Sequence, residues 1–204
     1  MSAAVTIVRT GAANLASVVV AFERLGSSVT ITDDALAVRD AKRVVLPGVG
    51  AFAPVARRLR ENGLGEAMCR RVEEDLPTLA ICLGLHLLAE GSEEGEDAGG
   101  LGLLEVTASR YKDSVVVPQL GWNSVEADRE CRLLSDGAAY FANSYRITDR
   151  PPGWRVAWSD HGGPFVAAVE RGNVLGCQFH PELSGAWGIE LLERWLESGG
   201  GVRC

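Results

Sequence analysis

Hydrophobic and polar positions in the first half of the chain follow two alternating patterns. Short apolar runs of four or five residues predict buried strands at 4–8, 28–32, 43–46 and 78–81. Apolar residues that recur every three or four positions predict amphipathic helices between these runs, at 15–25, 52–59 and 68–76. Strands that alternate with such helices indicate right-handed βαβ units and a parallel sheet with helices on both faces.

The second half is dominated by short β-rich stretches separated by Gly, Pro, Asp and Asn, which predicts hairpins and antiparallel pairs. These stretches lie at 103–109, 115–117, 139–142, 154–158, 165–169 and 174–179. A polar segment at 91–100 is typical of a solvated surface loop, and a last helix has Ile189, Leu192, Trp195 and Leu196 on one face. The 204 residues suit a single domain, 1–204. The predicted fold is α/β and three-layered, with a mostly parallel central sheet, helices on both faces and antiparallel additions.

Composition excludes several classes of function. The chain has 27 acidic and 20 basic residues, a net charge of −7, and no basic stripe that could replace the counterions of a nucleic acid. Its five cysteines have no CxxC spacing, which fits reduced thiols of a cytoplasmic protein better than disulfides or a zinc site. No apolar run approaches the ~18–20 residues that span a bilayer. We therefore expect no nucleic-acid or membrane partner, no metal and no cofactor.

Candidate chemistry begins at Cys82, where a predicted strand runs into an apolar helix. Small residues flank this cysteine at alternate positions, Ala80 and Gly84, as a nucleophile elbow requires, because its tight turn excludes larger side chains there. An elbow would place the thiol over a helix N-terminus, where the dipole stabilises the thiolate and the amide of Leu83 can face an oxyanion. The same pattern also suits a cysteine that only packs in the core.

His180 is the candidate base for this thiol. It follows a predicted strand, and Glu182 comes two residues later, so in an extended backbone both side chains would point the same way. A carboxylate placed there can accept from Nδ1–H and leave Nε2 free to take the proton of the thiol. We predict a catalytic Cys82–His180–Glu182 triad at the C-terminal edge of the sheet.

A third strand end, Leu-Pro-Gly-Val-Gly at 46–50, is predicted at the same edge. Positive φ at Gly48 and Gly50 would bring bare backbone N–H groups toward a ligand, although a simple strand-to-helix turn has the same sequence. Beside a nucleophile, the segment favours an oxyanion hole formed by Val49 and Gly50 together with Leu83.

Together these residues resemble the class I (triad) glutamine amidotransferases, and more closely the glutaminase subunits of imidazole glycerol phosphate synthase. The resemblance spans nearly the whole chain. It rests on Leu-Pro-Gly-Val-Gly-Ala-Phe at 46–52, Ile-Cys-Leu-Gly at 81–84, Val-Pro-Gln-Leu-Gly-Trp-Asn at 117–123, Tyr-Phe-Ala-Asn-Ser-Tyr at 140–145 and Gln-Phe-His-Pro-Glu at 178–182.

The resemblance implies that the chain hydrolyses glutamine through a thioester on Cys82. Ammonia would pass to a separate cyclase subunit, a (β/α)8 barrel bound as a heterodimer, which makes imidazole glycerol phosphate and AICAR in histidine biosynthesis. It also implies a glutamine site that includes Gly50, His86, Ser144 and Tyr145. The partner interface would include Asn14, Trp122 and Asn123.

This sequence departs from the family at three places. His86 stands where the family has a glutamine that contacts substrate, and Arg-Thr-Gly at 9–11 replaces Asp-Tyr-Gly. Gln119 and Asn143 stand where histidine is common; both amides can replace one imidazole hydrogen bond but cannot titrate. We expect His86 to donate to glutamine and, with an unperturbed pKa of ~6.5, to make KM fall as the pH drops through that range. Simple packing of His86 in the helix is the alternative.

Three other functions are compatible with the sequence. One is the glutaminase subunit of another synthase, such as that of anthranilate or pyridoxal phosphate, against which the Gly-Trp-Asn segment counts. A second is a catalytically weakened regulatory subunit, against which Cys82, His180 and Glu182 count. A third is a Cys–His peptide hydrolase, for which the chain leaves little room to build an extended cleft.

Overall fold

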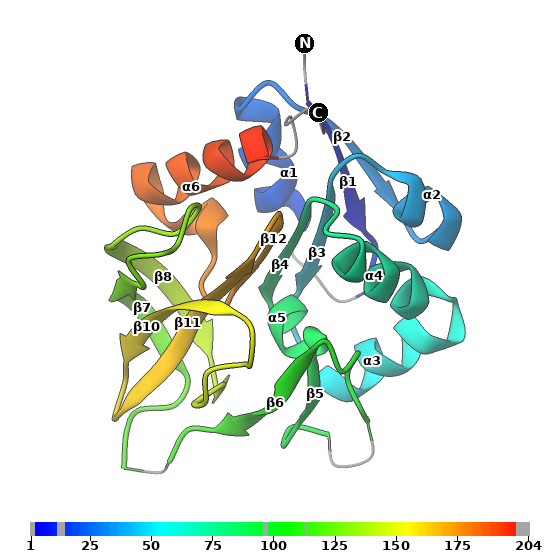
Figure 1. Ribbon diagram of the computed structural model, residues 1–204. Coiled ribbons are helices and arrows are strands. Elements are labelled where there is room, and N and C mark those ends of the chain that lie inside the picture. Colours follow the sequence, from blue (N-terminus) through cyan, green and yellow to red (C-terminus); the bar gives the residue numbers. More distant parts are fainter. Residues whose placement is uncertain (1–2, 12–14, 96–97, 113, 199–204) are drawn as a thin grey trace.

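The fold is organised around a nine-stranded sheet, seen in a computed structural model that describes residues 3–11, 15–95, 98–112 and 114–198 (Figure 1). The strand order is β2-β1-β3-β4-β12-β11-β10-β7-β8. The first five strands are parallel: β2 (Ser28–Thr32), β1 (Ala4–Val8), β3 (Val44–Gly48), β4 (Thr78–Cys82) and β12 (Val174–Cys177). The antiparallel extension comprises β11 (Pro164–Arg171), β10 (Arg155–Asp160), β7 (Gln119–Ala127) and β8 (Gly137–Asn143).

Helices cover both faces of the parallel half, so the predicted three-layer α/β class is confirmed. One face packs against α2 (Ala35–Asp40), α3 (Phe52–Glu61), α4 (Leu64–Glu73) and α5 (Leu83–Leu88). The other packs against α1 (Leu15–Arg24) and α6 (Gly185–Ser198), which lie together in Figure 1. The two hydrophobic cores form because the parallel strands are apolar on both sides, with every residue of β3 and β4 buried.

A small second sheet lies beside α5 in Figure 1 and consists of β5 (Ala89–Ser92), β6 (Leu104–Arg110) and β9 (Tyr145–Arg146). It corrects the prediction that 91–100 is only a solvated loop, because the start of that segment pairs with β6. The predicted strand at 115–117 is also wrong. These residues form bends and irregular backbone up to the cis Val117–Pro118 peptide, and the strand begins at Gln119.

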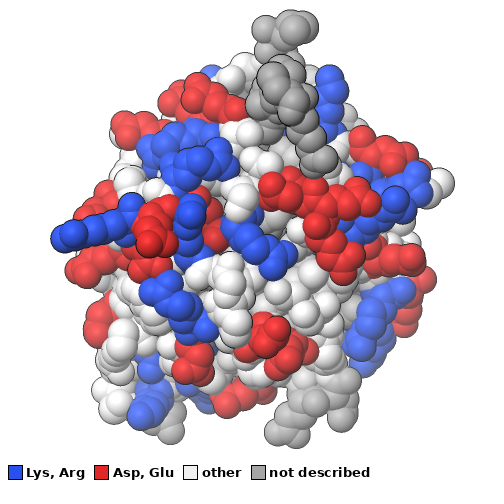
Figure 2. All heavy atoms as spheres, in the orientation of Figure 1, with Lys and Arg blue, Asp and Glu red and all other residues white. Residues whose placement is uncertain are grey.

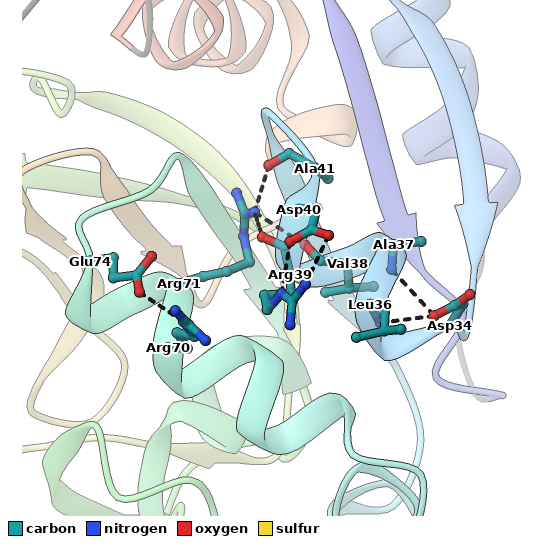
Figure 3. A network of polar contacts seen from close by, with 10 residues as sticks. All are labelled: Asp34, Leu36, Ala37, Val38, Arg39, Asp40, Ala41, Arg70, Arg71 and Glu74. Carbon is teal, nitrogen blue, oxygen red and sulfur yellow. Dashed lines mark hydrogen bonds and ion pairs between the residues drawn. The ribbon is translucent and has the colours of Figure 1, made fainter.

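The short helix α2, which supplies the crossover between β2 and β3, was not predicted from the sequence. Asp34 caps its first turn, with Oδ1 accepting from the amides of Leu36 and Ala37 at 2.8 and 3.3 Å. At the C-terminal end of α2, the fully buried guanidinium of Arg71 donates hydrogen bonds to three backbone carbonyls. These are the carbonyls of Val38, Arg39 and Ala41, as Figure 3 shows. A fourth bond reaches the carbonyl of Pro77 at 2.9 Å. Burial lowers the pKa of Arg71 to about 10, and four carbonyls take the place of a carboxylate partner.

The surface in Figure 2 carries basic and acidic side chains interspersed, with neither sign forming a stripe on that face. Among the residues that the structure describes, we find no helix with the length and apolar character needed to cross a membrane.

Candidate active site

Cys82 sits at a sharp turn between β4 and α5. Its φ of 54° and ψ of −109° lie in a region that residues with a side chain rarely adopt, and strain of this kind is concentrated at functional sites. The turn depends on Gly84, because a Cβ there would lie 2.1 Å from the carbonyl oxygen of Leu46. The chain therefore forms the nucleophile elbow that the small residues predicted.

The sulfur atom of Cys82 is mostly enclosed by protein. Its Sγ lies 3.8 Å from Nε2 of Gln178 and 4.0 Å from the carbonyl oxygen of Ala142. The cysteine as a whole is 8% exposed, and it lines a cavity of about 320 Å³. A small molecule in that cavity can reach the thiol.

His180 and Glu182 lie beside the elbow and form a pair. Nδ1 of His180 is 2.9 Å from Oε1 of Glu182, and both side chains are buried. Burial alone would lower the pKa of His180, but hydrogen bonds to Cys82 and Glu182, with the charges of both, raise that pKa to about 10. The imidazole is therefore held as a cation between a carboxylate and the sulfur.

The backbone that aligns this pair differs from the prediction. The strand β12 ends at Cys177, and Glu182 lies in a 3₁₀ turn, η1 (Pro181–Leu183), that begins after His180. An extended strand end is thus the wrong account of how the two side chains meet. Pro181 starts the tight turn with its fixed φ, and the turn brings the carboxylate back onto Nδ1.

The loop after β3 borders the same cavity through Val49 and Gly50. Gly50 has a φ of +93°, as expected, but Gly48 does not have a positive φ. Gly48 is needed for a different reason, because a Cβ there would lie 2.8 Å from the Cβ of Leu83. Leu83 also lines the cavity, so the three residues predicted for the oxyanion hole lie around one space.

His86 lines the cavity but has a protein partner. Its Nε2 lies 2.6 Å from Oε1 of Gln178, and the residue is 4% exposed. Burial lowers the pKa of His86 to about 4, with the bond to Gln178 opposing that shift. The unperturbed pKa assumed from the sequence is wrong, so the imidazole stays neutral at the pH values where glutamine KM was expected to change.

The cavity also contains a carboxylate that the sequence analysis missed. Glu94, in the segment predicted as a solvated loop, lines the cavity and accepts from the backbone N–H of Phe52 at 3.1 Å. Partial burial raises the pKa of Glu94, and the Phe52 amide opposes this. The only signal in the sequence was the high density of acids at 93–97, which is equally typical of an exposed loop.

Ser144 and Tyr145, which the resemblance assigns to a glutamine site, also line the cavity. The two amides found in place of histidines hold this wall through a shared tyrosine. The Tyr111 hydroxyl donates to Oε1 of Gln119 at 2.7 Å, and Nδ2 of Asn143 donates to that hydroxyl at 3.0 Å. The wall is therefore fixed by groups that do not titrate near neutral pH, since burial raises the pKa of Tyr111 to about 12.

Two of the residues predicted for a partner interface, Trp122 and Asn123, lie outside the cavity. Trp122 is 60% exposed on β7, next to Asn123, whose Nδ2 donates to the carbonyl of Asp160. Asn14, also predicted as an interface residue, lies outside the described residues.

Comparison with known proteins places this geometry in a family. The model of the glutamine amidotransferase class-I family matches residues 6–197. A crystal structure described as a glutamine amidotransferase superposes with a TM-score of 0.75 over 97% of this chain and 99% of that chain, and its 23% identity shows the fold alone.

Curated relatives are more similar in sequence. "Imidazole glycerol phosphate synthase subunit HisH" of Idiomarina loihiensis is 42% identical, covering 95% of this chain and 97% of that protein. The protein of the same name from Symbiobacterium thermophilum is 40% identical, with 95% and 93% covered. In Arabidopsis thaliana, "Imidazole glycerol phosphate synthase hisHF, chloroplastic" is 38% identical over 94% of this chain but only 34% of that protein. The chain belongs to the class I glutamine amidotransferases and is similar over nearly its full length to HisH subunits.

Proposed function

We propose that this chain is the glutaminase subunit of an imidazole glycerol phosphate synthase, which hydrolyses glutamine to glutamate and ammonia. One observation carries the proposal: Cys82 and His180 line a cavity of about 320 Å³, and Glu182 pairs with His180, in a chain about 40% identical to HisH subunits. The other described cysteines are poorer nucleophiles, because burial raises the pKa of Cys69, Cys131 and Cys177.

The reaction follows from the arrangement of these groups. The Cys82 thiolate attacks the side-chain amide carbon of glutamine and forms a C–S bond. The imidazolium of His180 gives its Nε2 proton to the leaving nitrogen as the C–N bond breaks, which leaves a thioester and ammonia. The neutral imidazole then takes a proton from water, the hydroxide opens the thioester, and glutamate leaves. Glu182 holds Nδ1–H throughout and keeps Nε2 directed at the sulfur.

Negative charge on the tetrahedral intermediate needs N–H donors beside the sulfur. Leu83 opens α5, and the first N–H groups of a helix have no partner within it, so its amide is one donor. The peptide between Val49 and Gly50 is the second. Because Gly50 has a positive φ, this peptide can turn its carbonyl or its N–H toward the cavity. We expect the isolated chain to be a poor glutaminase until partner binding selects the N–H orientation.

The walls of the cavity suit a free amino acid. The Glu94 carboxylate can pair with the α-ammonium group, while Ser144 and Tyr145 supply hydroxyls and backbone groups for the remaining polar atoms of glutamine. His86 borders the same space from α5.

Ammonia is proposed to leave toward a cyclase subunit, a (β/α)8 barrel bound as a heterodimer. A second cavity of about 210 Å³ adjoins the first and shares Val49, Ala142 and His180 with it. This cavity also contacts Leu183, which is 43% exposed. Leu120 and Trp122, 66% and 60% exposed on β7, form an apolar surface suited to a partner.

The proposed location is the cytoplasm, because the chemistry needs a reduced thiol and the four cysteines that the structure describes are free. Lyase activity would belong to the synthase that the partner completes.

Release of ammonia from glutamine, measured with and without the barrel subunit and its nucleotide substrate, tests the function. We expect slow release by the chain alone and rapid release in the complex with the nucleotide. No release under any condition would leave a regulatory subunit, and activation by an anthranilate or pyridoxal phosphate synthase subunit instead would assign the chain to that enzyme.

A further inference from the structure

The buried side chain of Gln178 connects His86 to the sulfur of Cys82. Gln178 follows β12, and the parallel register of that strand, with Cys177 opposite Ile81, places it beside Cys82. Its backbone amide donates to the carbonyl of Ala167 at 2.8 Å, and the residue has no exposed surface. Its side-chain amide has two neighbours, His86 on one side and Cys82 on the other.

The chemistry of the sulfur determines whether Nε2 or Oε1 of the Gln178 amide must face Cys82. Sγ is 4.0 Å from the carbonyl oxygen of Ala142, which can accept from a thiol but repels a thiolate. A thiolate therefore needs donors, and Nε2 of Gln178 at 3.8 Å is one in addition to His180. If the amide were reversed, Oε1 would face the thiolate and destabilise it.

His86 selects the productive orientation. A neutral imidazole whose Nε2 carries the proton donates to Oε1 of Gln178 at 2.6 Å, and this directs the amide nitrogen at Sγ. Burial, which lowers the pKa of His86 to about 4, keeps the imidazole neutral and adds no charge that would compete with His180.

We propose that His86 is a positioning residue that acts through Gln178, holding its side-chain amide as a donor to the Cys82 thiolate. The inference rests on the proposed function in taking Cys82 as the nucleophile. It assigns Gln178, which touches the reacting sulfur, to the catalytic machinery.

Alkylation of Cys82 by iodoacetamide tests the proposal without glutamine. Its rate would be followed by peptide mass spectrometry on the full chain from pH 5 to 10, because the thiolate is the reacting species. Two variants, Gln178→Met and His86→Phe, replace each polar side chain by an apolar one of similar size. His86→Gln keeps an N–H donor.

Each single variant should move the rate–pH profile of Cys82 alkylation upward by about one pH unit, because a hydrogen bond to a charged group is lost. The rate should therefore fall about tenfold on the rising part of the profile and stay the same on its upper plateau. The double variant should be no slower than Gln178→Met, since His86 acts only through that amide. His86→Gln should recover the wild-type profile. Alkylation of Cys69, which lies away from the cavity, is the internal control and should not change.

Several results would overturn the proposal. A wild-type profile for His86→Phe would mean that His86 only packs, and additive effects would mean that it acts independently of Gln178. An alkylation rate that falls by the same factor at every pH would indicate altered access of iodoacetamide to Cys82 and not an altered fraction of thiolate. Thermal unfolding checks each variant, and His86→Leu, which also lacks an N–H, replaces His86→Phe if that variant does not fold.

The other groups around the sulfur stay the same in all variants. His180 contacts Cys82, Glu182 contacts His180, and Glu94 and Tyr145 border the cavity. A chain that fails to release ammonia from glutamine but shows the predicted alkylation profiles would refute the proposed function and leave the positioning role standing.

Discussion

Gly84 offers a direct test of the elbow, because its replacement by alanine changes one methyl group at the point of closest backbone contact. The new Cβ would lie 2.1 Å from the carbonyl oxygen of Leu46, whereas ordinary contact for a Cβ begins at 3.4 Å. Leu46 is fully buried in the middle of the sheet and cannot yield. The start of α5 must then move by about 1 Å, because the new Cβ and the carbonyl oxygen of Leu46 cannot overlap.

Both stability and activity should respond to this movement. Overpacking of this size costs about 3 kcal/mol, which lowers Tm by about 6–12 °C in a chain of this length. A displacement of the nucleophile by about 1 Å should also reduce kcat by about 10²-fold. The assays are thermal unfolding of the chain and ammonia release from glutamine in the complex with the cyclase.

Gly91→Ala is the matched control, because that glycine has no positive φ and a Cβ there meets no atom within 4 Å. It should change stability by less than about 0.5 kcal/mol and leave the rate unchanged. If Gly84→Ala had the Tm and kcat of the wild type, the close contact would not exist in solution, and Gly84 would not be required for the elbow.

Four further predictions concern the site and its support. Cys82→Ala should reduce glutamine-dependent synthesis by about 10⁴-fold or more and leave synthesis from added ammonium intact; an active variant would contradict the assignment. His180→Ala should lose about 10–100-fold more kcat than Glu182→Ala, because the orienting group is the less costly to remove, and equal losses would count against their roles. Burial lowers the pKa of His86 from 6.5 to about 4, so the unfolded state binds its proton first as the pH falls. Stability should therefore drop by up to about 3 kcal/mol between pH 6.5 and 4, a loss that His86→Phe removes and that urea unfolding at the two pH values measures. Arg71→Met should destabilise the chain by about 3 kcal/mol in the same unfolding assay with kcat unchanged, because it strips donors from four carbonyls far from the cavity, and a stability equal to that of the wild type would refute this.

The features that could be predicted from the sequence depend on neighbours in the chain. The elbow at Cys82 needs small residues two positions away, and the pairing of His180 with Glu182 needs a turn of three residues, so both leave a local trace. The parallel half of the sheet was likewise visible, because strands buried on both sides are continuous apolar runs.

The features that were missed depend on tertiary contacts. Glu94 reaches the cavity only because β5 pairs with β6. This pairing places the acidic segment, which the sequence suggests is solvated, next to the N-terminus of α3. The helix α2 has only six residues, too few to show a period in the sequence. Its last carbonyls depend on hydrogen bonds donated by Arg71, which lies on another helix. No local pattern encodes either contact.

His86 shows how the same limit applies to a predicted site residue. It lies one turn into α5 and lines the cavity, but its partner is 92 residues away along the chain and is fixed by the register of β12 against β4. The register places the Gln178 amide, the amide satisfies the imidazole, and burial keeps that imidazole neutral. A histidine can therefore stand at the family's glutamine position without adding charge near the His180 imidazolium, because what both side chains can offer there is a neutral N–H donor.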